Sequence, residues 1–128
     1  MKIKNIFDIA GRAMAAQMVR LNTISSNLAN AGATTGDPET VYKPLKPEFK
    51  TQYSENVKKN GISTVNVSKV VELQKEPFKI FDPNHPLADG DGYIYKAPIN
   101  VEEEMVDMMD ASRQYQNNVE VISTLRAL

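Results

Sequence analysis

The stretch LNTISSNLANAGATTGD, residues 21–37, decides how the chain begins to fold. It opens with the apolar spacing of a helix and ends in residues that do not propagate one. Asn30 and Gly32 are expected to end the helix in the left-handed cap conformation. Asn27 lies inside the helix, one residue before Leu28, where asparagine has poor helix propensity. Two explanations of Asn27 stay open: it sets the register of helix packing, or it faces water.

A seven-residue repeat extends upstream from this stretch and recurs at the other end of the chain. Such a repeat predicts helices that pack along a narrow apolar seam, as in a coiled coil. Each seam has one polar break, Gln17 in the first and Ser112 in the second. The first seam consists of Phe7, Ala10, Met14, Gln17, Leu21, Ile24 and Leu28, and the second of Val101, Met105, Met108, Ser112, Tyr115, Val119 and Ile122.

The distribution of proline divides the chain into three parts. All seven prolines lie between Pro38 and Pro98. We therefore predict helical arms at residues 1–30 and 101–128, forming one discontinuous domain, around a middle segment of residues 31–100. The fold class is mainly α with a small β and loop middle. Chain continuity favours an antiparallel coiled-coil pair, because the middle can then leave and re-enter at one end.

Charge also distinguishes the two arms. Residues 1–30 hold four basic residues and one acidic residue, a net charge of +3. Residues 101–128 hold two basic and six acidic residues, a net charge of −4. Opposite charge favours pairing of the two arms with each other over self-pairing, while the apolar seams supply most of the affinity.

The middle segment reads as partly β. Apolar residues alternate in GISTVNVSKVVEL, and the aromatic runs EPFKIFD and GYIYKA are short strand candidates. The Asp-Gly-Asp-Gly run at residues 89–92 predicts a turn. Residues 31–60 are rich in Thr, Pro, Lys and Asn, and are expected to form a long loop.

Composition argues against several classes of function. The net charge of −1 gives no case for nucleic-acid binding, and the absence of cysteine excludes disulfides and thiolate metal sites. No segment has the roughly 20 consecutive apolar residues that span a bilayer. The amino-terminal stretch lacks the apolar core of a cleaved signal peptide, since Asp8, Arg12, Gln17 and Arg20 interrupt it.

Candidate chemical groups are few. His85, in DPNHPLADGDG, is either a base or metal ligand or part of a rigid turn, and the proline-flanked context favours the turn. The run VEEEMVDMMD is either a cation site or a set of acids at a helix N-terminus, and the helix dipole favours the second. Its methionines fit a seam better than a promiscuous binding face. No phosphate loop, nucleophile elbow, zinc motif or complete calcium loop is present, so no enzyme, metal site or cofactor is predicted.

Two sets of residues resemble a known family. The N-terminal helix ends in Asn27-Leu28-Ala29-Asn30 and continues with Thr34 and Thr35, which is similar to the signature of bacterial flagellar rod and hook proteins. The run from Phe78 onward is similar to proximal-rod members of that family. It contains His-Pro-Leu-Ala-Asp, Gly-Tyr, Glu-Met-Val and Ala-Ser-Arg-x-Tyr-Gln-x-Asn-Val-Glu. The resemblance is weak over residues 36–75.

The resemblance implies a structural subunit of the basal-body proximal rod, exported by the flagellar type III apparatus without a cleaved signal and located in the periplasm. Its terminal helices would polymerise into a helical tube that forms the drive shaft and the wall of the export channel. Implied partners are copies of itself, other rod proteins, and proteins of the basal-body ring and near the export gate. No direct membrane insertion is implied.

The resemblance also sets expectations for particular residues. Asn27 would hydrogen-bond a neighbouring subunit and fix register. Relatives continue a few residues past the equivalent of Leu128, so the last turns of the acidic arm are expected to be short or missing. The expected assembly interface comprises Phe7, Met14, Leu21, Asn27, Leu28, Asn30, Met105, Met108, Tyr115, Val119 and Ile122.

Two other functions are compatible with parts of the sequence. A cytoplasmic coiled-coil adaptor would explain the seven-residue repeats but not the rod-like motifs. A small enzyme would use His85 and the nearby carboxylates.

Overall fold

The computed structural model describes residues 3–52 and 64–128. Two long helices, α1 at Ile3–Asn30 and α3 at Val101–Ala127, flank a middle of short strands. The strands are β1 at Thr34–Thr35, β2 at Leu45–Gln52, β3 at Thr64–Glu72, β4 at Phe78–Phe81 and β5 at Tyr93–Lys96, with a short 3₁₀ helix at Pro38–Thr40. The predicted helical arms and the small β middle are therefore confirmed.

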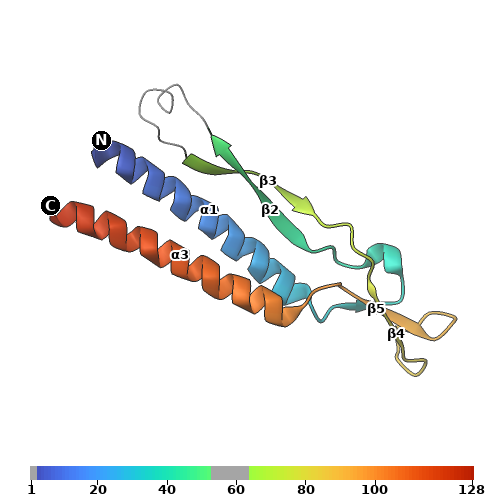
Figure 1. The fold of residues 1–128 in the computed structure, drawn as a ribbon. Coiled ribbons are helices and arrows are strands. Elements are labelled where there is room, and N and C mark those ends of the chain that lie inside the picture. Colours follow the sequence, from blue (N-terminus) through green and yellow to red (C-terminus); the bar gives the residue numbers. More distant parts are fainter. Residues whose placement is uncertain (1–2, 53–63) are drawn as a thin grey trace.

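The helices and one pair of strands lie alongside one another (Figure 1). Helix α1 contacts α3 on one side and β2 and β3 on another. The N-terminus and C-terminus lie at the same end of the helix pair, and β4 and β5 lie beyond its other end (Figure 1). Among the described residues, no helix has the length and apolarity needed to cross a membrane.

Helix α3 begins at Val101 because Asn100 caps it. The side-chain Oδ1 of Asn100 accepts hydrogen bonds from the backbone N–H groups of Glu102 at 3.1 Å and Glu103 at 3.2 Å. Acids fill the first turn, where the helix dipole favours negative charge. The acidic run thus belongs to a helix start, as the charge pattern favoured.

Helix α1 ends at Asn30 without the left-handed cap expected from the sequence. Among the described residues, only Gly92 has a positive φ, at 88°. The side chain of Asn30 instead donates to the carbonyl oxygen of Ser26 at 2.8 Å, and the N–H of Ala31 reaches the carbonyl of Leu28. The side chain and a tightened last turn satisfy carbonyls at the helix end, so no left-handed residue is needed.

The strands form two separate small sheets. Strands β2 and β3 pair antiparallel, with a bulge between Glu48 and Phe49. Strands β1, β5 and β4 form the second sheet in that order, and both pairings are antiparallel. The three predicted strand segments correspond to β3, β4 and β5. The predicted loop at residues 31–60 is wrong where β1 and β2 occupy it, and its residues 53–60 lie outside the described chain.

Strand β2 was not predicted from the sequence because its inward positions include a proline. Leu45, Pro47 and Phe49 alternate along the strand, and all three line the same cavity beside α1. Lysine and proline have low strand propensity, so the segment reads as a loop. A two-stranded sheet leaves each strand one open edge, which is where strands tolerate proline.

Half of the buried apolar residues in the described part of the chain are alanines. Ala111 of α3 is 0% exposed, and Ala10, Ala16 and Ile24 are buried on α1. A second cluster of Val41, Ala97 and Ile99 lies where the chain joins the helices to the β1–β5–β4 sheet. This distribution describes a thin core, because each helix retains a broad exposed surface.

Candidate functional site

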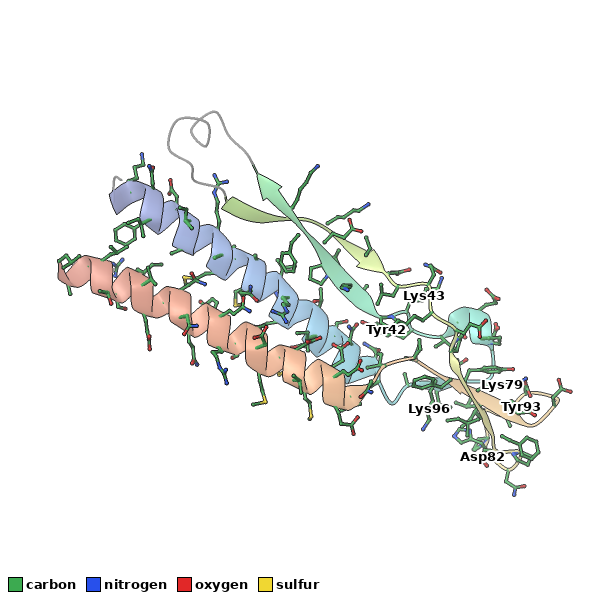
Figure 2. The ribbon with its side chains drawn as sticks, in the orientation of Figure 1. Tyr42, Lys43, Lys79, Asp82, Tyr93 and Lys96 are labelled. Carbon is green, nitrogen blue, oxygen red and sulfur yellow. The ribbon has the colours of Figure 1, made fainter. Side chains whose placement is uncertain are left out.

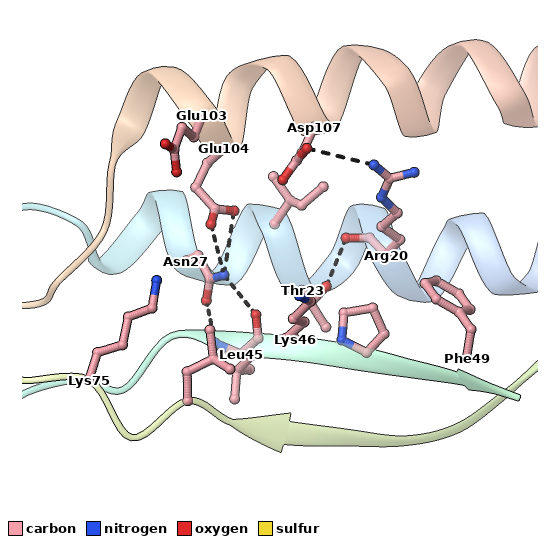
Figure 3. Close-up of a pocket in the computed structure, with 13 residues that line it drawn as sticks. Arg20, Thr23, Asn27, Leu45, Lys46, Phe49, Lys75, Glu103, Glu104 and Asp107 are labelled. Atoms are coloured by element: carbon pink, nitrogen blue, oxygen red, sulfur yellow. Dashed lines mark hydrogen bonds and ion pairs between the residues drawn. The ribbon is translucent and has the colours of Figure 1, made fainter.

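The site that ties the three parts of the chain together is built around Asn27. Its side chain is 2% exposed and makes two hydrogen bonds to the backbone of Leu45. The Nδ2 group donates to the carbonyl oxygen of Leu45 at 2.9 Å, and Oδ1 accepts from the N–H of Leu45 at 2.8 Å. The amide therefore occupies the place that a neighbouring strand would take at the start of β2 (Figure 3).

Two further groups complete the hydrogen bonding of Asn27. The hydroxyl of Tyr42 donates to Oδ1 at 2.9 Å, and Nδ2 lies 3.4 Å from a carboxylate oxygen of Glu104 on α3. All four hydrogen-bonding positions of the amide are thus occupied within the chain. The side chain therefore does not face water, and its hydrogen bonds join α1 to β2 and α3 within one chain.

Glu104 is affected by its position beside Asn27. Desolvation by burial raises the pKa of its carboxyl group, and the hydrogen bond from Asn27 acts in the opposite direction. Asp107 and Glu103 add to the rise, while Lys75 opposes it. Among the described residues, the hydrogen-bond partners of Asn27 include two ionisable side chains, the half-buried carboxylate of Glu104 and the hydroxyl of Tyr42.

Two further polar contacts join the two helices, one or more turns away from Asn27. The guanidinium of Arg20 lies 3.0 Å from Asp110 and 3.7 Å from Asp107, both on α3. Gln17 donates to Gln114 at 3.0 Å. The ion pairs of Arg20 therefore join the basic first arm to the acidic second arm, as the opposite net charges of the arms predict.

A cavity of about 450 Å³ opens between the two helices and the β2–β3 pair (Figure 3). Its polar lining includes Asn27, Glu104 and the pair formed by Arg20 and Asp107. These groups already bond one another, and no nucleophile stands beside a base. The arrangement is suited to positioning helices and strands, not to acid–base or nucleophilic chemistry. The rest of the lining is Thr23, Ile24, Leu45, Lys46, Pro47, Phe49, Leu73, Lys75 and Glu103.

The residues predicted for the first seam all lie at protected positions of α1. Phe7, Met14, Leu21 and Leu28 are half-buried, and Asn30 is half-buried at the helix end. The polar break of the seam, Gln17, is the residue that bonds Gln114 of α3.

The second seam differs in phase from the prediction. Met108, Tyr115 and Ile122 are half-buried, but Met105 is 54% exposed and Val119 is 39% exposed. The protected positions of α3 again alternate spacings of four and three, but along a stripe displaced around the helix. They are Glu104, Met108, Ala111, Tyr115, Asn118, Ile122 and Leu125, and Ser112 of the predicted seam is half-buried beside them. In the sequence, the apolar residues Ala111 and Leu125 could have indicated this displaced stripe.

His85 is part of a turn. Its Nδ1 accepts the backbone N–H of Leu87 at 3.0 Å, and its own backbone N–H donates to the carbonyl of Asp82. No group of three or more His, Cys, Asp and Glu side chains suited to a metal ion occurs in the described part of the chain. Nothing in this geometry supports the reading of His85 as a ligand or base.

The predicted turn at residues 89–92 is confirmed, and Asp89 organises it. Its Oδ1 accepts from the backbone N–H of Tyr93 at 2.9 Å and of Asp91 at 3.0 Å. Its Oδ2 accepts from the hydroxyl of Tyr95 at 3.1 Å. The hydrogen bond from the Tyr93 N–H is the main cause that lowers the pKa of Asp89. Gly92 closes the turn with its positive φ.

Comparison with known protein families gives matches to both ends of the chain. Residues 7–36 match the family described as flagella basal body rod protein. Residues 91–128 match the family described as flagellar basal body rod FlgEFG protein C-terminal. The two matched segments contain most of α1 and all of α3.

Full-length relatives align along the whole chain. It is 41% identical to the flagellar basal-body rod protein FlgC of Salmonella typhimurium, covering 100% of this chain and 93% of the relative. It is 38% identical to the FlgC protein of Yersinia enterocolitica, with the same two shares. It is 37% identical to the FlgC protein of Aquifex aeolicus, covering 100% of this chain and 92% of the relative.

Proposed function

The chain belongs to the flagellar basal-body rod protein family, and from this premise we propose how it acts as a structural subunit of the proximal rod. The observation that carries the function is the alignment of the whole chain with FlgC proteins at up to 41% identity. The protein is a structural component of the flagellar basal body and not an enzyme. The coiled-coil adaptor alternative has no support, because the matches to both termini are to rod proteins.

The working unit is the pair of terminal helices. We propose that α1 and α3 form an antiparallel coiled-coil pair and so one discontinuous domain, residues 1–30 with 101–128. The order of their contacts supports this, since residue 17 bonds 114, residue 20 pairs with 110, and residue 27 approaches 104. Residues 31–100 form the segment outside the pair.

Copies of this unit assemble into a helical tube in the proposed mechanism. A contact between different surfaces of identical subunits does not close on itself and generates a filament. Such a tube would serve as drive shaft and as the wall of an export channel. The stiffness that torque requires would come from bundled helices of roughly 40 Å each, at about 1.5 Å per residue.

The residues proposed for the assembly interface fall into two groups. Met105 and Val119 are exposed, so they are available to a neighbouring subunit directly. The half-buried members support the interface by holding the helix pair together, and Asn27 does so from inside the subunit. This second group is Phe7, Met14, Leu21, Asn27, Leu28, Asn30, Met108, Tyr115 and Ile122.

The proposed partners and location follow from the family. The subunit would contact copies of itself and other rod proteins, and at the ends of the rod it would meet ring proteins and proteins near the export gate. It would be exported by the flagellar type III apparatus without a cleaved signal and would act in the periplasm.

Leu28→Asp tests the role of the helix pair in assembly. Leu28 is half-buried at the end of the α1 seam, and a carboxylate there would lose hydration without a partner, at a cost of several kcal/mol per subunit. Cells carrying only this variant should export the protein but lack rods in electron micrographs and fail to swim. Leu28→Met, which keeps the volume and apolarity, should swim normally. Normal rods with Leu28→Asp would contradict the seam assignment.

A further inference from the structure

The helix pair has a face that the β2–β3 pair does not cover. On α1, the exposed positions from residue 8 onward, apart from Arg12, recur at spacings of three and four, so they form a stripe. Most of its side chains are small, and a Cβ built at Gly11 would meet no atom within 4 Å. We call this the small stripe: Asp8, Gly11, Ala15, Met18, Asn22, Ser25 and Ala29.

On α3, large apolar side chains are exposed along a corresponding line. Met105 is 54% exposed and Met109 is 67% exposed, with Val101 and Val119 on the same side of the helix. At about 100° per residue, these four positions span less than a quarter of the helix circumference. We call them the apolar stripe. They adjoin the protected seam, and each of them is at least 36% exposed.

Both stripes lie on the same side of the molecule. On α1, Asn27 and Arg20 point toward the cavity beside β2, and on α3, Glu103 and Asp107 line the same cavity. In both helices the exposed stripe lies across the seam from these cavity residues. Figure 2 shows sulfur-tipped side chains on the edge of α3 that faces away from β2 and β3. The uncovered face thus presents small residues on one helix and large apolar residues on the other.

The chemistry of the two stripes identifies what fits them. Flexible methionine side chains pack into a surface of glycine, alanine and serine, because small residues let helices approach closely. Charge favours the same partner at the level of the arms: residues 1–30, which carry the small stripe, have a net charge of +3, and residues 101–128, which carry the apolar stripe, have a net charge of −4. Lys4 adjoins the small stripe, which contains one acid, Asp8, whereas Glu102 and Glu120 adjoin the apolar stripe. None of the ion pairs among the described residues uses these two acids. A surface complementary to each stripe is therefore present on the chain itself.

We propose that the apolar stripe of one copy packs on the small stripe of the next copy. The occupant of each stripe is a second copy of this chain, and the contact joins two different surfaces. Because such a contact is heterologous, it leaves an unused stripe on every terminal copy and propagates instead of closing into a dimer. The proposal rests on the proposed function and specifies which faces of the helix pair carry it.

Cysteine cross-linking tests the pairing, since the chain has no cysteine of its own. Ala15→Cys and Met109→Cys place thiols on the two stripes, and Val106→Cys places one on an exposed position of α3 outside them. Cells would co-express two differently tagged variants, and isolated basal bodies would be treated with a flexible bis-maleimide. The expected product is a dimer of Ala15→Cys with Met109→Cys.

The controls separate this proposal from the proposed function. Each variant alone, and Ala15→Cys with Val106→Cys, should give no dimer. Dimers of Met109→Cys with itself, or equal yields with Val106→Cys, would overturn the pairing. Absence of any dimer from basal bodies that contain both variants would also overturn it. Exclusion of the wild-type tagged chain from basal bodies would instead contradict the proposed function.

A second variant pair tests the same contact without cross-linking. Ala15→Leu fills the small stripe, and Met109→Gln removes an apolar side chain from the other. Both positions are exposed, so the urea midpoint of the purified chain should be unchanged while rods are lost. Val106→Gln should leave both the midpoint and the rods unchanged. Normal rods with Ala15→Leu would overturn the proposal.

Discussion

At the scale of a single residue, Asn27 shows how one side chain joins three distant segments. It lies on α1, hydrogen-bonds both the N–H and the carbonyl of Leu45 at the start of β2, and contacts the carboxylate of Glu104 on α3. A buried amide with every position bonded is stabilising, and one with lost partners is costly. The poor helix propensity of asparagine is therefore offset by the contacts that its amide makes between elements.

Asn27→Ala should destabilise the purified chain. The change leaves the N–H and C=O of Leu45, which bond the buried amide in a part-buried site, without their partner, and each group left unsatisfied costs up to about 1–3 kcal/mol. Urea unfolding followed by circular dichroism should show a lower midpoint. Asn22→Ala removes the same side chain from an exposed position of the same helix and should leave the midpoint nearly unchanged. Equal midpoints for the two variants would contradict the bridging role of Asn27.

At the scale of an element, the first turns of α3 combine two opposing demands. The Asn100 cap and the acids of the first turn stabilise the helix start. Glu104, the last acid of that turn, lies at the junction with α1, where burial raises the pKa of its carboxyl group. A group whose pKa is higher in the folded chain favours folding when protonated. Its contribution is greatest at low pH and is lost as pH rises through the folded-state pKa.

Glu104→Gln should therefore change stability in a pH-dependent way. Glutamine keeps an oxygen that accepts from Asn27 but carries no charge to desolvate. Relative to the unchanged chain, the variant should have a higher urea midpoint at neutral pH, and the difference should shrink as pH falls into the acidic range. Glu102→Gln removes an exposed acid from the same turn that does not contribute to the pKa shift of Glu104, and it serves as the control. A difference that grows on acidification would contradict the sign of the pKa shift.

At the scale of the whole molecule, the contacts that hold the helix pair are unevenly distributed along it. Asn27, Arg20 and the cavity gather where α1, α3 and the β2–β3 pair meet. Toward the two termini, the protected residues of α3 are only half-buried after Ala111, and Leu125 is the last of them. Elements with few buried contacts open locally at low cost. A subunit of this kind acquires its remaining burial from neighbouring copies.

Amide hydrogen exchange on the dilute chain should therefore show a gradient along both helices. Residues 4–9 of α1 and 115–127 of α3, which include no buried residue, should exchange faster than residues 20–28 and 104–111, because the second group includes the bridging contacts. In assembled rods the gradient should disappear. Uniform protection along α1 in the dilute chain would contradict this description.

The sequence by itself determined the two helices, their limits and the short aromatic strands. These features depend on local physics: seven-residue spacing, acids at a helix N-terminus, and aromatic runs bounded by turn residues. The turn at Asp89 could also be predicted from the sequence, because its hydrogen bonds join residues within a few positions of one another. The motifs that resemble rod proteins lie in the same segments.

Only the tertiary structure decided which faces those helices use. Helix α3 offers two stripes with the same spacing, one through Met105 and Val119 and one through Ala111 and Leu125, and the sequence pattern fits both. The close approach of α1 selects the stripe through Ala111, which is fully buried, and leaves Met105 exposed. Strand β2 and the partners of Asn27 likewise depend on contacts across the chain. Local propensity carries no information about contacts between distant segments, so these contacts could not be predicted from the sequence.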